Sequence, residues 1–126
     1  MKRIAMLLAQ QFEDLEAHMP YQALQTAGHH VDVISPEAGE TLVGKQGQCQ
    51  FRSDSAVALA RAEDYHMLVI PGGRSPELLR TVAGAIKFVQ RFGHSGKLIA
   101  AMCLGPQLLI WADLIRGRQK SPAPSR

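Results

Sequence analysis

Residues 98–106 read Leu-Ile-Ala-Ala-Met-Cys-Leu-Gly-Pro, an apolar run that ends at a cysteine, a glycine and a proline. Short continuous apolar runs are typical of strands in parallel sheets, because helices cover both faces of such a sheet. Proline is tolerated in the first turn of a helix, where its missing N–H group has no partner to lose. The pattern predicts a strand over residues 98–102, a bend at Cys103 and a helix over residues 106–112.

The predicted bend at Cys103 is tight, because the strand and the helix are only a few residues apart. Such a reversal strains the middle residue and needs small residues two positions before and after it, where Ala101 and Gly105 stand. The helix N-terminus would lower the pKa of the Cys103 thiol, since unpaired N–H groups and the helix dipole favour the thiolate. A lone cysteine is more often a small core residue, and Cys49 is interpreted in that way. The setting of Cys103 favours a reactive thiol.

Apolar runs and helical patterns alternate along the rest of the chain. We predict strands at residues 4–9, 31–35 and 67–70 and helices at residues 15–27, 55–62 and 75–92, the last in one or two pieces. Residues 38–52 contain three glycines, which predict a hairpin or an irregular excursion. Alternating strands and helices imply βαβ units, so the sequence predicts an α/β fold with a mostly parallel sheet.

Two prolines bear on the ends of the predicted helices. Pro20 lies inside the helix at residues 15–27, so we expect either a later start near Met19 or a kink. Ser75 followed by Pro76 predicts an N-cap residue and a proline at the first helical position.

Chemistry-bearing residues follow three of the predicted strands. Glu13, the Gly72-Gly73 turn and Cys103 each come after an apolar run. In parallel α/β sheets, functional groups gather at the carboxyl ends of the strands. The sequence therefore predicts a site at this edge of the sheet.

Composition and charge restrict the class of protein. The 126-residue chain is 46% hydrophobic, which suits one globular domain with one core. Its formal net charge is +3, but the last eleven residues contribute +4, which leaves −1 for residues 1–115. This distribution argues against nucleic-acid binding. The first apolar run is too short for a secretory segment or a membrane span, and two cysteines make no disulfide framework, so we expect a cytoplasmic protein.

Several short motifs, in this order and spacing, make residues 3–118 resemble the ThiJ/PfpI family of the class I glutamine-amidotransferase-like superfamily. They are Phe12-Glu13-Asp14, Gly28-His29, Gly44-Lys45, Val69-Ile70-Pro71-Gly72-Gly73-Arg74-Ser75-Pro76-Glu77, Cys103-Leu104-Gly105-Pro106-Gln107 and Arg116-Gly117-Arg118. The resemblance implies a flavodoxin-like three-layer sandwich over residues 1–118. Family domains are longer, so the C-terminal strands and closing helix are expected to be missing. Residues 119–126 form a basic Pro/Ser-rich tail for which we expect disorder.

The resemblance also assigns site residues. Cys103 takes the place of the nucleophile, and Glu13 would approach its sulfur as a protonated carboxyl group. The backbone N–H groups of Gly73 and Leu104 would form the oxyanion hole. Glu77 would supply an acid across a subunit interface of a homodimer or higher homo-oligomer.

Plain alternatives accompany these assignments. Glu13 and Glu77 can each also be interpreted as an ordinary acidic residue near the start of a helix. Gly72, Arg74 and His18 are candidate substrate contacts, although His18 also suits a solvent-facing helix position. We predict no metal and no cofactor, because the other histidines flank strand starts at the opposite end of the sheet, namely His29, His30, His66 and His94.

Three functions are compatible with this pattern. The first is a cysteine-dependent hydrolase, glyoxalase or deglycase that acts on reactive carbonyls or peptides, as the resemblance implies. Its activity would be weak, because PfpI-type members carry histidine where this chain has Leu104. The second is a non-catalytic stress-response thiol sensor or binding protein, in which Cys103 oxidises beside Glu13. The third is a truncated, inactive remnant of the family.

Overall fold

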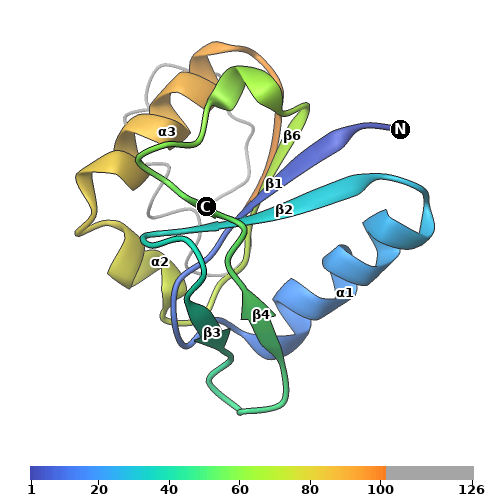
Figure 1. Ribbon diagram of the computed structural model, residues 1–126, viewed down its shortest axis with the longest axis vertical. Coiled ribbons are helices and arrows are strands. Elements are labelled where there is room, and N and C mark those ends of the chain that lie inside the picture. Colours follow the sequence, from blue (N-terminus) through green and yellow to red (C-terminus); the bar gives the residue numbers. More distant parts are fainter. Residues whose placement is uncertain (102–126) are drawn as a thin grey trace, which may run out of the picture.

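A five-stranded parallel sheet in the order β5-β2-β1-β6-β7 forms the centre of the computed structural model, which describes residues 1–101 (Figure 1). The strands and helices run in the chain order β1 Arg3–Leu7, α1 Asp14–Thr26, β2 His30–Ser35, β3 Thr41–Val43, β4 Gln50–Arg52, β5 Ser55–Ala56, a 3₁₀ turn Ala62–Asp64, β6 Met67–Ile70, α2 Ser75–Leu79, α3 Ala83–His94 and β7 Leu98–Ala101. Every strand contact in this sheet is parallel. The predicted α/β fold is confirmed.

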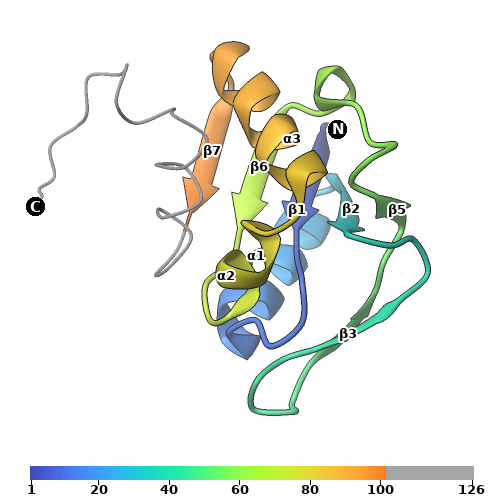
Figure 2. The same ribbon diagram turned by 90° about the vertical axis from the view of Figure 1, so that its left-hand side faces the viewer.

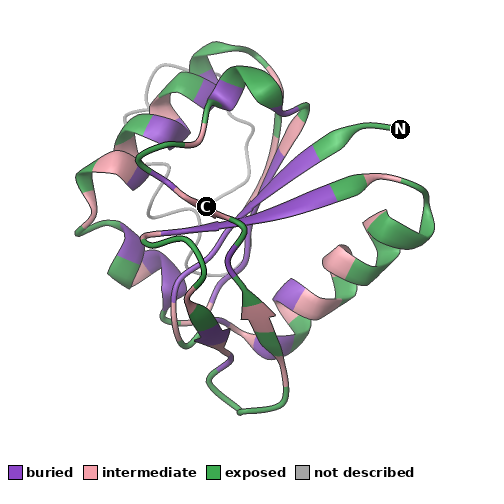
Figure 3. Cartoon of the chain, in the orientation of Figure 1, coloured by how far each residue is buried: buried purple, intermediate pink, exposed green. Residues whose placement is uncertain are grey.

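Helices cover both faces of the sheet because successive residues of a strand point to opposite sides. Met6 of β1 belongs to the core beneath α1 and the β3–β4 hairpin. Its neighbour Leu7 belongs to the core beneath α2 and α3, together with Phe88 and Phe92. Helices α1 and α3 lie on opposite sides of the strands, and β1 and β2 are almost wholly buried between them (Figures 1 and 3). This is a three-layer sandwich of the flavodoxin-like kind.

The sequence located most of the elements correctly. Strand β2, strand β6 and the hairpin at residues 38–52 occur where they were predicted, and the helical stretch 75–92 forms in two pieces, α2 and α3. The described residues end at Ala101, within the predicted strand at residues 98–102, so the predicted bend at Cys103 and the helix at residues 106–112 lie outside them. The tail at residues 119–126 lies outside them as well.

Two local predictions were wrong. Residues 55–62 do not form a helix, because Ser55–Ala56 pair with the end of β2 and extend the sheet edge. Ser75 is not an N-cap residue: Arg74 stands there, and the buried Ser75 hydroxyl accepts a hydrogen bond from the Ala9 N–H at 2.8 Å. Tertiary contacts decided both cases. Of the two alternatives for Pro20, the later start near Met19 does not occur, because α1 begins at Asp14 and continues through Pro20; the kink stays a prediction.

No helix within residues 1–101 is long and apolar enough to cross a membrane.

Candidate functional site

The order in which successive strands join the sheet reverses at β1. Strand β2 lies on one side of β1 and strand β6 on the other, so the segments that leave β1 and β6 emerge side by side at the carboxyl edge of the sheet. Such a switch point is where open α/β sheets bind ligands. Strands β1, β6 and β7 point to this same edge, where α2 lies (Figure 2). The predicted position of the site therefore agrees with the topology.

Backbone hydrogen bonds join the two segments that leave β1 and β6. Phe12 and Gly73 form an isolated antiparallel bridge. In this bridge the Glu13 N–H donates to the Gly72 carbonyl at 3.0 Å, and the Arg74 N–H donates to the Gln11 carbonyl at 2.9 Å. The loop before α1 and the turn before α2 therefore form one rigid unit.

Within this unit, Gly73 occupies a position where a residue with a side chain would not fit. Its φ of +86° lies in the left-handed region, which favours glycine. A Cβ atom there would lie 2.8 Å from the Gln11 carbonyl oxygen and equally close to Phe12. Within residues 1–101, the Gly73 N–H has no hydrogen-bond acceptor. An N–H group held by its neighbours and left without an acceptor is able to stabilise an oxyanion.

Three acids at the start of α1 have three different partners. The Glu13 carboxylate is 2.9 Å from the Lys45 ammonium group. The Asp14 carboxylate accepts N–H groups from the hairpin. The Glu16 carboxylate accepts the Gly72 N–H at 2.9 Å. This edge of the sheet therefore carries two half-buried carboxylates, Glu13 and Glu16, and a fully buried one between them.

Asp14 is 1% exposed and lies beneath the tip of the β3–β4 hairpin, which Figure 1 shows beside the start of α1. Its oxygens accept the N–H groups of Gln46 at 2.8 Å, Gln48 at 2.9 Å and Cys49 at 3.0 Å. Burial by itself would raise the pKa of Asp14, but these backbone N–H groups overcome that effect and hold the pKa below its ordinary value. The carboxylate is therefore charged and fully engaged.

Glu77 and Arg74 lie on or next to α2 and form a solvent-exposed contact, with 3.8 Å between Arg74 Nε and Glu77 Oε1. His18 lies on α1, and neither Gly72 nor Gly73 is among the residues that line the hollow it faces. It lines a hollow of about 580 Å³ between α1 and the hairpin, which also includes Tyr21, Phe51 and several glutamines. The structure thus brings Glu13, Gly72 and Gly73 together and places His18 elsewhere.

Sequence reasoning missed two charged residues at this edge. Glu16 lies in the first turn of α1, three residues after the N-cap residue Glu13, and helical spacing was the available signal. Lys45 follows Gly44 in the hairpin, and only the tertiary fold brings it to Glu13. Cys103 and Leu104 lie outside the described residues.

Cys49 differs from the reactive thiol expected at Cys103. It is half-buried against the core beneath α1. Burial first, and then the charge of Asp14, raise the pKa of its thiol. A raised thiol pKa lowers the thiolate fraction, which fits the interpretation of Cys49 as a structural residue.

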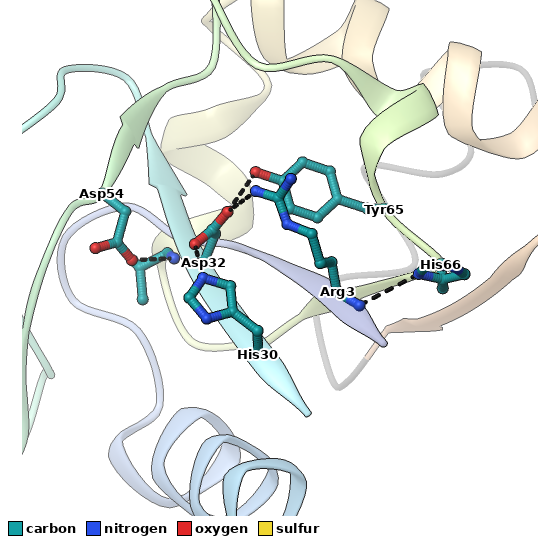
Figure 4. A network of polar contacts seen from close by, with 7 residues as sticks. Arg3, His30, Asp32, Asp54, Tyr65 and His66 are labelled. Atoms are coloured by element: carbon teal, nitrogen blue, oxygen red, sulfur yellow. Dashed lines mark hydrogen bonds and ion pairs between the residues drawn. The ribbon is translucent and has the colours of Figure 1, made fainter. Parts of the chain in front are cut away.

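The amino edge of the sheet carries a separate polar cluster, which we call the Asp32 cluster: Arg3, His30, Asp32 and Tyr65 (Figure 4). Asp32 accepts hydrogen bonds from Arg3 at 2.7 Å and from the Tyr65 hydroxyl at 2.8 Å, and its other oxygen is 2.7 Å from His30 Nε2. Nearby, the His66 ring accepts the Arg3 N–H at 3.2 Å. Among residues 1–101, no three or more His, Cys, Asp or Glu side chains are grouped so as to hold a metal ion.

Comparison with known proteins shows which sequences and folds this chain resembles. The chain is 41% identical over 118 residues to Protein/nucleic acid deglycase 2 of Escherichia coli, which covers 94% of this chain and 69% of the relative. It is 40% identical to General stress protein 18 of Bacillus subtilis, with the same shares covered. The solved two-domain protein of Anabaena variabilis, which contains DJ-1/ThiJ/PfpI-like and ferritin-like domains, matches with a TM-score of 0.91 and 39% identity over 94% of this chain and 34% of that one.

The family model for DJ-1/PfpI matches residues 2–125, which is almost the whole sequence. The motifs that carried the resemblance, the order of the parallel strands and the joined turns at the switch point agree with that match. The chain therefore belongs to the DJ-1/PfpI family.

Proposed function

We propose that this protein is a cysteine-dependent hydrolase of the deglycase or glyoxalase type, with Cys103 as the nucleophile and a small-molecule carbonyl compound as substrate. The observation that carries the proposal is the Gly73 N–H, which is fixed at the switch point and has no acceptor within residues 1–101. A relative that is 41% identical is named a deglycase, which supports the same class of reaction.

Chain connectivity brings the nucleophile toward this edge. Ala101 pairs with Ile70 in the sheet, directly before the turn that contains Gly73. Cys103 follows Ala101 by two residues, so covalent geometry keeps the two Cα atoms within about 7 Å. The candidate nucleophile and the candidate oxyanion donor therefore follow neighbouring strands.

The proposed reaction starts with the Cys103 thiolate. Its sulfur adds to the carbonyl carbon, a C–S bond forms, and the π electrons of the carbonyl group move to oxygen. The N–H groups of Gly73 and Leu104 would hold the resulting oxyanion. Protonation of that oxygen gives a hemithioacetal with an aldehyde substrate, and a carboxyl group is the natural proton source.

Two acidic side chains are candidates for that proton transfer, each of which would have to act in its protonated carboxyl form. The sequence pointed to Glu13, while the structure adds Glu16, which contacts the Gly72-Gly73 turn. Glu77 has an exposed carboxylate on α2 that a second subunit could receive at its own site, so we keep it as the acid of a homo-oligomer. Leucine at position 104 cannot exchange a proton, so we expect slow turnover.

Turnover of methylglyoxal by the purified chain tests the proposal. We expect weak activity in the unaltered protein, none in Cys103→Ser, and an increase of about 10²-fold in Leu104→His, because an adjacent general base contributes on that order. Glu13→Gln and Glu16→Gln, assayed separately, identify the carboxylate that matters. Equal rates in the unaltered protein, Cys103→Ser and Leu104→His would exclude a catalytic Cys103. Oxidation of Cys103 by mild peroxide without any turnover would instead favour the thiol sensor.

A further inference from the structure

Asp14 follows the candidate acid Glu13 directly, but its side chain does not reach the Gly72-Gly73 turn. It is buried under the hairpin tip, which we define as residues 44–49, and accepts three N–H groups from that tip. A carboxylate that accepts several backbone N–H groups holds a loop in one conformation, because each lost bond would leave a buried charge short of partners. The conformation of the hairpin tip therefore depends on Asp14.

Other contacts hold the same tip against the loop before α1. The Lys45 N–H donates to the Phe12 carbonyl at 2.9 Å, and the Gln11 N–H donates to the Val43 carbonyl at 2.9 Å. A Cβ atom at Gly44 would collide with the Asp14 carboxylate. The absence of a side chain there is what permits the close approach. The hairpin therefore both donates hydrogen bonds to and accepts hydrogen bonds from the residues that precede α1.

The docked tip presents Lys45 to Glu13. The Lys45 ammonium group lies 2.9 Å from the Glu13 carboxylate, whose side chain is 30% exposed. Lys45 directly precedes Gln46, whose N–H group donates to Asp14, and the N–H group of Gln48 donates to Asp14 as well. A shift of the tip would therefore also move the Lys45 ammonium group. An ordinary surface ion pair contributes little to stability, but here it sets the charge beside the candidate site.

We propose that Asp14 is a positioning residue that acts through the hairpin tip: it holds Lys45 against Glu13, and Lys45 in turn favours the thiolate form of Cys103. The inference rests on the proposed function of Cys103. It assigns to the hairpin a part in the reactivity of the thiol, although the hairpin lies outside the parallel sheet.

The direction in which one substitution changes the rate of Cys103 alkylation separates this proposal from a direct electrostatic effect. Asp14→Asn removes a negative charge, and by charge alone it would favour the thiolate and speed its alkylation. If Asp14 acts by holding Lys45 in place, the same substitution releases a positive charge from the site and slows the reaction. Lys45→Met removes that positive charge directly, so the two variants should shift the reactivity in the same direction.

Alkylation of Cys103 by iodoacetamide across a range of pH measures this reactivity. Trypsin cleavage after Lys45, Arg52, Lys97 and Arg116 places Cys49 in residues 46–52 and Cys103 in residues 98–116. In Lys45→Met the cleavage site after residue 45 is lost, and Cys49 lies in residues 4–52 instead. Mass spectrometry therefore follows each thiol separately in every variant. We expect Asp14→Asn and Lys45→Met each to slow Cys103 alkylation at neutral pH by about three- to tenfold, since one pKa unit is tenfold in thiolate. Lys45→Arg should keep the original rate.

The double variant and a matched control complete the experiment. Asp14→Asn combined with Lys45→Met should be no slower than Lys45→Met alone, because both remove one interaction. Asp54→Asn is the control, since Asp54 also accepts a backbone N–H, from Val33 at 2.7 Å, but its partner lies in β2 and not in the hairpin tip. It should leave the alkylation rate unchanged.

The possible outcomes separate the two proposals. If Cys103 reacts rapidly and the protein turns over methylglyoxal, but Asp14→Asn is unchanged or faster, the positioning role is wrong and the proposed function stands. If Cys103 is inert in the unaltered protein, both are wrong. If Asp14→Asn does not fold, Lys45→Met decides: its side chain is 41% exposed, so the variant should fold, and an unchanged rate would overturn the proposal.

Discussion

The amino edge and the carboxyl edge of the sheet both carry clusters of acidic and basic side chains, but the hydrogen bonding of the two clusters differs. At the amino edge, both oxygens of Asp32 have partners, which are Arg3, His30 and Tyr65 (Figure 4). At the carboxyl edge, Glu13 and Glu16 flank a turn whose Gly73 N–H has no acceptor within residues 1–101. A cluster of Arg, His, Asp and Tyr resembles an active site in composition, yet both oxygens of its carboxylate already have partners within the cluster. A group held in place and left without a partner is the better mark of a site.

The pKa shifts of the amino edge agree with this contrast. Burial would raise the pKa of Asp32, but hydrogen bonds from Tyr65, Arg3 and His30 overcome it and lower the pKa. Burial, followed by the hydrogen bond to Asp32, raises the pKa of the Tyr65 hydroxyl. Both shifts lock the ordinary charge states of these groups, which suits a structural cluster.

The largest effect is expected at the carboxyl edge, from Gly73→Ala. The added methyl group meets backbone atoms of Gln11 and Phe12, so the Gly73 N–H must move. Loss of one oxyanion donor typically costs about 10²–10³-fold in turnover. The methylglyoxal rate per folded molecule should fall by that factor, with the folded fraction measured by circular dichroism. A rate that follows only the folded fraction would mean that Gly73 is merely structural.

The next effect is expected at the amino edge, from Asp32→Asn. The substitution weakens hydrogen bonds to charged groups, each worth about 1.5–3 kcal/mol, and the exposure of Arg3 and His30 moderates the loss. We expect a decrease of about 2 kcal/mol in the free energy of unfolding, measured with urea. Cys103 alkylation under native conditions should stay the same, and a slower reaction would show that the two edges are coupled.

Acid should weaken both edges, to a smaller extent. The pKa values of Asp14 and Asp32 are lowered in the folded protein, so their contribution to stability is present above the ordinary carboxyl pKa of about 4 and is lost as the pH falls below it. Urea midpoints measured between pH 6 and pH 3 should decrease. The corresponding loss in the free energy of unfolding should be about 1–2 kcal/mol smaller in Asp14→Asn, which has no charge to lose at that position. Parallel curves for the two proteins would contradict the role given to Asp14.

The smallest effect on stability is expected from Glu77→Gln. The Arg74–Glu77 contact is long and exposed, and such pairs contribute at most about 0.5 kcal/mol. The urea midpoint should therefore hardly change. A fall in the methylglyoxal turnover of Glu77→Gln would then indicate a chemical role for Glu77. Unchanged turnover would show that Glu77 is not part of the site.

Several features of the site were predictable because they depend on local patterns. The run at residues 67–70 followed by Pro71-Gly72-Gly73 marks a buried strand and a sharp turn, and both occur. Glu13 was predictable in the same way, as an acid that follows the first apolar run. The helix at residues 55–62 was wrong because its sequence is compatible with helix, and only pairing with β2 made Ser55–Ala56 a strand.

The sequence alone determined the alternation of strands and helices, the family and the side of the sheet on which the candidate residues gather, because apolar periodicity and short motifs act over neighbouring residues. The tertiary structure alone decided which charges meet: Lys45 with Glu13, Glu16 with Gly72, and Asp14 with the hairpin tip. These partners lie 32 to 56 positions apart in the sequence. No local pattern encodes such a contact, because it depends on how the sheet and the hairpin pack in space.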